Sequence, residues 1–139
     1  MIYLALVKPH FMKKWLLVFI LSFSLNWLWE NFHSNLYIHF QSGEITSAVL
    51  LYASLVDALI ITAAIFLFHH LPQTYQKIWL LVLALVATSV FIEWRALLMD
   101  RWAYNDLMPL IPWLNIGLTP TVQLGLTGYL TYFFFSRKN

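Results

Sequence analysis

Residues 15–37 read WLLVFILSFSLNWLWENFHSNLY, and this stretch decides the fold because it joins an uncharged apolar run to a regular polar series. No charge occurs from Trp15 to Leu25, which is typical of a membrane-spanning helix. The polar side chains recur at the three- and four-residue spacing of one helix face: Ser22, Asn26, Glu30, His33 and Tyr37. Because carboxylate, amide and imidazole groups are costly against lipid, this face is expected to line a protein interior or a wet cavity.

The composition favours the same surroundings. The chain has 139 residues, of which 61% are hydrophobic and 10% are charged, and this is too apolar for an ordinary soluble domain. Four segments reach the roughly 20 residues that a helix needs to cross a hydrocarbon core of about 30 Å. We therefore predict an all-α integral membrane protein, with a single membrane domain over residues 1–139. Its four-transmembrane-helix bundle is expected to use helices at about 14–38, 46–69, 77–99 and 113–136.

The basic residues predict the orientation of this bundle. Most of them flank the helix ends that come together in an up-down arrangement: Lys8, Lys13, Lys14, Lys77, Arg137 and Lys138. By the positive-inside rule, the N and C termini are expected to be cytoplasmic, in a bacterial inner (plasma) membrane. The excess of basic residues therefore indicates how the bundle is oriented in the membrane, and we expect no nucleic-acid partner. The chain has no cysteine, which excludes disulfides and thiolate metal sites.

Acidic and amide side chains are expected to meet in the outer half of the bundle. At about 1.5 Å rise per residue, Glu30 and Glu93 each lie on the order of 22–24 Å from the cytoplasmic helix start. Asp57 and Asn26 are expected nearer the midplane. Gln123 lies one turn inside the outer surface if the fourth helix begins near Thr119. The predicted site comprises Asn26, Glu30, His33, Asp57, Glu93 and Gln123.

Aromatic residues are frequent at the same level. Trp29 and Trp94 either belong to an interfacial aromatic belt or wall the pocket beside their acidic neighbours. An aromatic-walled acidic pocket suits a cationic ligand. The connection over residues 100–118 contains Tyr104 and several prolines, so it is expected to be either an interfacial anchor or a re-entrant lid over the acids.

The fourth helix also carries a ridge of small residues, Gly117, Gly125 and Gly128. Such ridges allow close helix contact. We expect the lipid bilayer as the general partner, and a homodimer or a larger membrane complex is an alternative that would use this ridge.

Several functions remain open at this level. We favour an outward-facing pocket that binds a lipid-like, isoprenoid or cationic small molecule, and that converts it by acid–base chemistry if the protein is an isomerase, cyclase or lipid-modifying enzyme. The catalytic candidates are Glu30, Asp57 and Glu93. The ligand-binding candidates are Asn26, Trp29, His33, Trp94, Tyr104 and Gln123.

The alternatives are a small, dimeric proton- or cation-coupled transporter and a structural accessory subunit of a membrane complex. No cofactor is predicted. A metal ion is the lesser alternative, with Glu30, His33, Asp57 and Glu93 as ligands, because only one Glu-x-x-His pair occurs in the chain.

Overall fold

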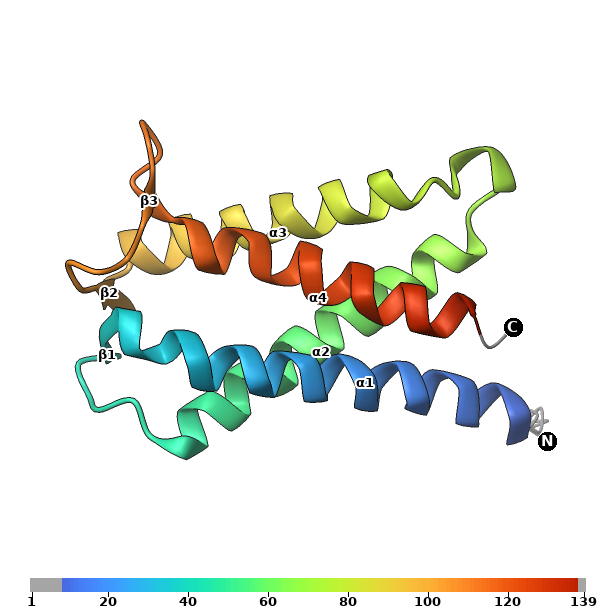
Figure 1. Ribbon diagram of the computed structural model, residues 1–139, viewed down its shortest axis with the longest axis horizontal. Helices are drawn as coiled ribbons and strands as arrows, with labels where there is room; N and C mark the ends of the chain where they lie inside the picture. Colours follow the sequence, from blue (N-terminus) through green and yellow to red (C-terminus); the bar gives the residue numbers. More distant parts are fainter. Residues whose placement is uncertain (1–8, 138–139) are drawn as a thin grey trace, which may run out of the picture.

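Four long helices dominate the protein, as seen in a computed structural model that describes residues 9–137. They are α1 (Pro9–His33), α2 (Ser47–His70), α3 (Ile78–Leu98) and α4 (Leu118–Ser136) (Figure 1). Lys8 and Lys138, which contribute to the predicted orientation, lie outside the described residues.

Three of these helices are long and apolar enough to cross a membrane, namely those over Phe11–Leu36, Ser47–His70 and Ile78–Leu98. The mostly helical chain is therefore consistent with a membrane location. The fourth predicted span, α4, is not among the three within the described part of the chain. Its 19 residues include Gln123, four threonines and two glycines, which lower its hydropathy.

Two helix boundaries differ from the predicted ones for local reasons. The first helix ends at His33, short of residue 38, because the chain continues through a 3-10 turn (η1, Ser34–Leu36) into a strand. The last helix begins at Leu118, later than residue 113. Trp113 and Asn115 have φ angles of 66° and 52°, in the left-handed region that a right-handed helix excludes.

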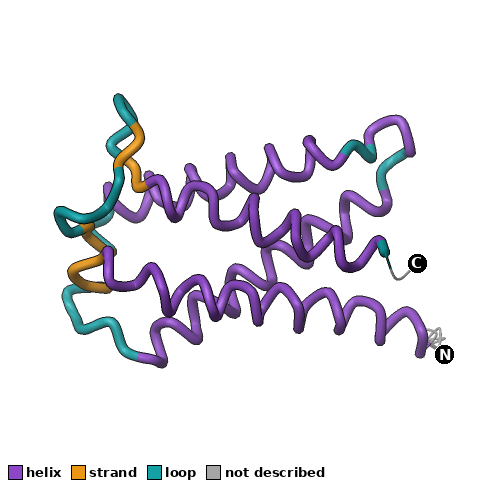
Figure 2. Tube along the Cα trace, viewed as in Figure 1, coloured by secondary structure: helices purple, strands orange, loops and turns teal. Residues whose placement is uncertain are grey.

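The structure also contains short strands that the all-α prediction did not include. β1 (Tyr37–Phe40) pairs antiparallel with β2 (Trp102–Tyr104), and β3 (Leu110–Ile111) pairs antiparallel with β4 (Ile116–Gly117). Figure 2 shows all the strands at one end of the molecule, opposite the end where the described chain starts and finishes. We call these the strand end and the terminal end.

The helices lie side by side but not equally close. α1 packs along α2 and also touches α4, and α3 packs along α4, whereas α2 contacts α3 much less. Figure 1 shows α2 and α3 joined at the terminal end, through the turn η2 (Gln73–Tyr75), and separating toward the strand end.

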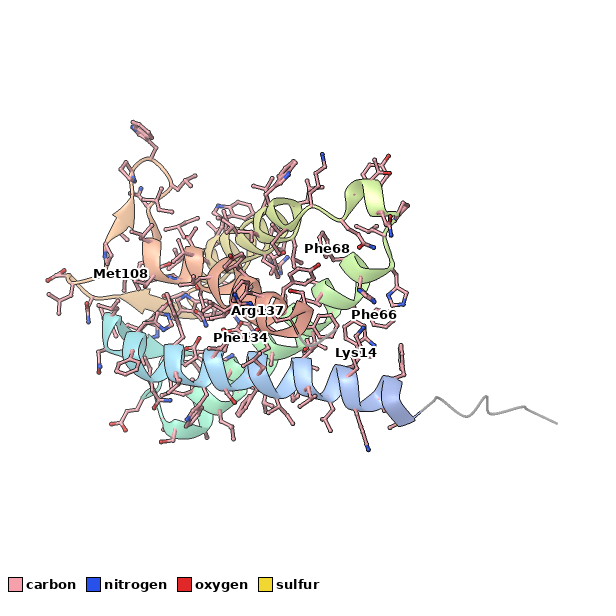
Figure 3. The ribbon with its side chains drawn as sticks, turned by 45° about the vertical axis from the view of Figure 1, so that its right-hand side comes forward. Lys14, Phe66, Phe68, Met108, Phe134 and Arg137 are labelled. Atoms are coloured by element: carbon pink, nitrogen blue, oxygen red, sulfur yellow. The ribbon has the colours of Figure 1, made fainter. Side chains whose placement is uncertain are left out.

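An apolar core fills the terminal half of the bundle. Its buried members come from all four helices: Val18, Ile61, Ile65, Phe68, Leu81, Leu85 and Leu124. Aromatic rings close this half, since Trp15 and Phe66 have ring centroids 4.9 Å apart. Figure 3 places Phe66 and Lys14 on the terminal side and Met108 at the opposite end.

The small residues of α4 are used within the chain. A Cβ atom on Gly125 would come within 2.5 Å of Val86 Cγ2, and one on Gly128 would collide with Leu85. A Cβ on Gly117 would lie 2.8 Å from Met108 Sδ. The ridge therefore packs against α3 and the strand-end connection, so a dimer formed through these glycines would first have to open those contacts.

Candidate functional site

The polar face of α1 turns toward the other helices. Ser22 and Asn26 are completely buried, and Glu30 and His33 are 9% and 7% exposed. Since the apolar faces of α1 remain exposed on the outside of the bundle, the predicted amphipathic arrangement places its polar groups inward.

Gln123 of α4 connects this face to α2. Its amide nitrogen Nε2 lies 2.7 Å from Glu30 Oε1, 2.7 Å from Asp57 Oδ2 and 3.1 Å from Asn26 Oδ1. The carboxyl groups of Glu30 and Asp57 therefore both lie next to the same amide nitrogen. Because an amide nitrogen has only two hydrogens, the three acceptors share them. We refer to Asn26, Glu30, Asp57 and Gln123 as the carboxyl–amide cluster.

Glu93 of α3 forms a second centre with a different set of partners. Its Oε2 accepts hydrogen bonds from the Trp102 indole at 3.1 Å and from the Tyr104 hydroxyl. Its Oε1 lies 3.5 Å from the Tyr37 hydroxyl. All three donors lie in or at the start of strands β1 and β2. Glu93 therefore ties the strand end of the protein to α3.

The two tyrosines remain hydrogen-bond donors. Burial, followed by the charge of Glu93, raises the pKa of Tyr37 well above that of a free phenol. The same two causes raise the pKa of Tyr104. Both hydroxyls thus keep their protons at neutral pH and can donate to the carboxylate.

The β1–β2 pairing explains the placement of these donors. Tyr37 lies opposite Tyr104, and Phe40 lies opposite Trp102. Residues 102–104 of the connection thus lie against Glu93. At the tip of the connection, in the turn between β3 and β4, Trp113 is 98% exposed.

A cavity of about 420 Å³ lies beside both centres. All three carboxyl residues, Glu30, Asp57 and Glu93, line it, together with His33 and Ser89. Its apolar wall comes from α2 and α3: Val49, Leu50, Ala53, Val56 and Ile92. Arg101 also borders it and is exposed. A site of this size with a few convergent polar groups is of the kind that holds a small ligand.

The structure thus brings Asn26, Glu30, Asp57 and Gln123 into one cluster and places Glu93 and His33 on the same cavity. Tyr104 contacts Glu93 directly.

The two predicted tryptophans lie differently. Trp29 sits beside His33, with ring centroids 6.2 Å apart and its indole N–H buried, but it is not among the cavity-lining residues. Trp94 is 51% exposed on the outer side of α3 and does not line the cavity either.

Three residues that contact the acids or line the cavity were not among the predicted site residues. Trp102 donates to Glu93, Tyr37 belonged to the polar face of α1 but was given no role, and Ser89 lines the cavity. Ser89 lies four residues before Glu93, on the same helix face, and this spacing is the signal that could have identified it.

Among the residues from 9 to 137, no group of three or more histidines, cysteines, aspartates or glutamates is arranged to hold a metal ion. The amide of Gln123 lies between the carboxyls where a cation would otherwise sit.

The chain matches no protein-family model, and it resembles none of the curated proteins or solved structures with which it was compared. Any function must therefore be inferred from the site.

Replacing Gln123 with leucine should destabilise the protein. The substitution keeps the volume but leaves Glu30 and Asp57 without their shared donor, at an expected loss of about 1–2 kcal/mol. Thermal unfolding in detergent measures the loss. Gln73→Leu, in the exposed η2 turn, is the control and should leave the melting temperature unchanged. Equal melting temperatures for the two variants would show that the amide does not hold the cluster together.

Proposed function

We propose that the protein spans the membrane as a four-helix bundle and binds a lipid-like small molecule in the cavity at its strand end, which it converts by acid–base chemistry. The supporting observation is that a single cavity meets all three carboxyl residues and an apolar wall. A protein in the bilayer meets hydrophobic molecules there, so the proposed substrate is of the isoprenoid or sterol-like kind.

The pair Glu30–Asp57 supplies the chemistry in this proposal. Both carboxyl groups lie within 2.7 Å of the same amide nitrogen, and two carboxyl groups held this close do not both ionise readily. In this proposal the pair shares one proton. One member can then donate a proton while the other accepts one, as isomerisation and cyclisation require. Glu93 differs, because the hydroxyls of Tyr37 and Tyr104 and the indole of Trp102 already donate to its carboxyl oxygens.

Transport is a second candidate, supported by the polar groups that continue along α4. The Thr127 hydroxyl lies 3.3 Å from Asn26 Oδ1, and Thr131 follows one turn further on and is completely buried. The apolar core of the terminal half, however, closes this route with side chains such as Ile61, Ile65 and Leu85. A cavity that ends against a dry core favours binding and conversion over passage.

The orientation in this proposal has the terminal end in the cytoplasm. Lys13, Lys14, Lys77 and Arg137 lie at this end, next to the starts of α1 and α3 and the end of α4. The cavity then opens in the outer half of a bacterial inner membrane.

The orientation can be measured directly because the chain has no cysteine. Single cysteines at Glu44 and Asp106, both exposed at the strand end, should react with a membrane-impermeant maleimide in intact spheroplasts. A cysteine at Thr74, in the η2 turn, should react only after the membrane is permeabilised. The reverse pattern would place the cavity on the cytoplasmic side.

The proposed chemistry can be tested without knowing the substrate. Purified protein is incubated in D₂O with vesicles made from a total lipid extract of its host. A carboxylate that removes a proton from carbon exchanges it with solvent, and the returning deuteron labels that carbon. We expect one lipid species to gain deuterium, detected by mass spectrometry, and Glu30→Gln and Asp57→Asn to slow labelling by roughly 100-fold or more.

The exposed acid Glu44 provides the matched control, since Glu44→Gln should label at the rate of the unchanged protein. Unlabelled lipids with the unchanged protein, or equal labelling by all variants, would contradict acid–base conversion.

A further inference from the structure

Two residues that line the cavity have buried polar atoms without a hydrogen-bond partner among the described residues. They are His33, at both ring nitrogens, and Ser89, at Oγ. His33 is 7% exposed and Ser89 is 3% exposed, and both residues line the cavity. A buried polar atom without a partner costs about 1–3 kcal/mol, so such atoms commonly mark the place where a ligand binds.

The groups present define what such a ligand must offer. A serine hydroxyl both donates and accepts, and a neutral imidazole has one donor and one acceptor nitrogen. The other ring nitrogen of His33, Nδ1, lies 3.8 Å from Glu30 Oε2. A hydroxyl can donate to or accept from either group, and a carbonyl oxygen can accept from either, so both are suitable uncharged partners.

Charged head groups fit this wall less well. An anion would lie among three carboxyl residues, whose repulsion opposes it, and Arg101, the arginine that borders the cavity, is exposed to solvent. A cation would have to compete for carboxyl oxygens that already accept hydrogen bonds from this chain. Glu93 has three donors, and Glu30 and Asp57 share the Gln123 amide.

The apolar wall shows the direction from which a lipid reaches these atoms. Val49, Ala53 and Val56 of α2 face Ile92 of α3 across the cavity. They lie in the half of the molecule where α2 and α3 separate (Figure 1). Tyr52, which borders the cavity on α2, is 62% exposed to the surroundings of the bundle. In a membrane-spanning bundle this exposed side of the cavity would meet the lipid, so a lipid chain would enter between these two helices.

From these observations we propose that the cavity takes an uncharged lipid whose polar end is a hydroxyl or carbonyl oxygen. The oxygen binds between His33 and Ser89, and the chain leaves between α2 and α3. This inference rests on the proposed binding function and narrows its ligand class, because it selects a neutral oxygen over a cationic head group.

A photoaffinity experiment tests the inference. The protein in lipid nanodiscs is labelled with an isoprenoid alcohol that carries a diazirine on its chain. The label should appear on α2 and α3 residues that border the cavity, and unlabelled geranylgeraniol should displace it. The amine and the carboxylic acid of the same chain should compete at least about tenfold more weakly.

Ser89→Ala should weaken the apparent affinity for the alcohol about fivefold, the effect of one lost hydrogen bond. Ser22→Ala is the matched control, because the Ser22 hydroxyl is also buried and unpartnered but does not line the cavity. It should leave the affinity unchanged.

Two results would overturn the inference: stronger competition by the amine than by the alcohol, or equal affinities in the two serine variants. Its failure can be told apart from that of the proposed conversion. If the alcohol binds but no lipid gains deuterium, the proposed conversion is wrong and the inferred binding site stands. If a lipid gains deuterium but the protein prefers the amine, the inferred binding site is wrong and the proposed conversion stands.

Discussion

The amide of Gln123 is the interaction on which the arrangement of the site depends. It lies within hydrogen-bond distance of side chains on α1 and α2 while its own helix packs on α3, so one side chain links the whole bundle at the level of the acids. Two carboxyl groups are thereby kept in contact where an apolar environment makes their separation from water costly. Both Glu30 and Asp57 line the cavity, where the proposed proton transfer would take place.

The remaining structure divides around this cluster into a closed half and an open half. Ile61, Ile65 and Leu85 fill the terminal half with apolar contacts, and glycines on α4 let α3 approach closely. In the other half, α2 and α3 separate, and Glu93 holds the β1–β2 sheet over the gap through Trp102 and Tyr104. The cavity thus combines polar groups on α1, α3 and α4 with an apolar wall from α2 and α3, a combination that fits the proposed lipid-like ligand.

The helical period and the rise per residue predicted which charged and amide side chains of the helices come together, but Ser89 was missed. The spacing of Asn26, Glu30 and His33 placed them on one buried helix face. The rise per residue, counted from the helix ends, placed Glu93 and Gln123 in the same half of the bundle. The same period explains why Trp94 lies elsewhere, since consecutive helical residues point about 100° apart and Trp94 follows Glu93 directly. The strand pairing that brings Trp102 and Tyr104 onto Glu93 depends on contacts between distant segments, and no local pattern in residues 100–118 specifies it. The start of α4 was placed too early because the left-handed turn residues Trp113 and Asn115 give no glycine signal.

An experimental structure of the protein in nanodiscs that contain lipids of its host tests the central claim most directly. The account predicts elongated density that enters between α2 and α3 and ends within hydrogen-bond distance of Ser89 Oγ and His33 Nε2, beside the Glu30–Asp57 pair. A closed cavity, in which Ser89 and His33 bond to neighbouring side chains and α2 packs against α3 along its length, would contradict it.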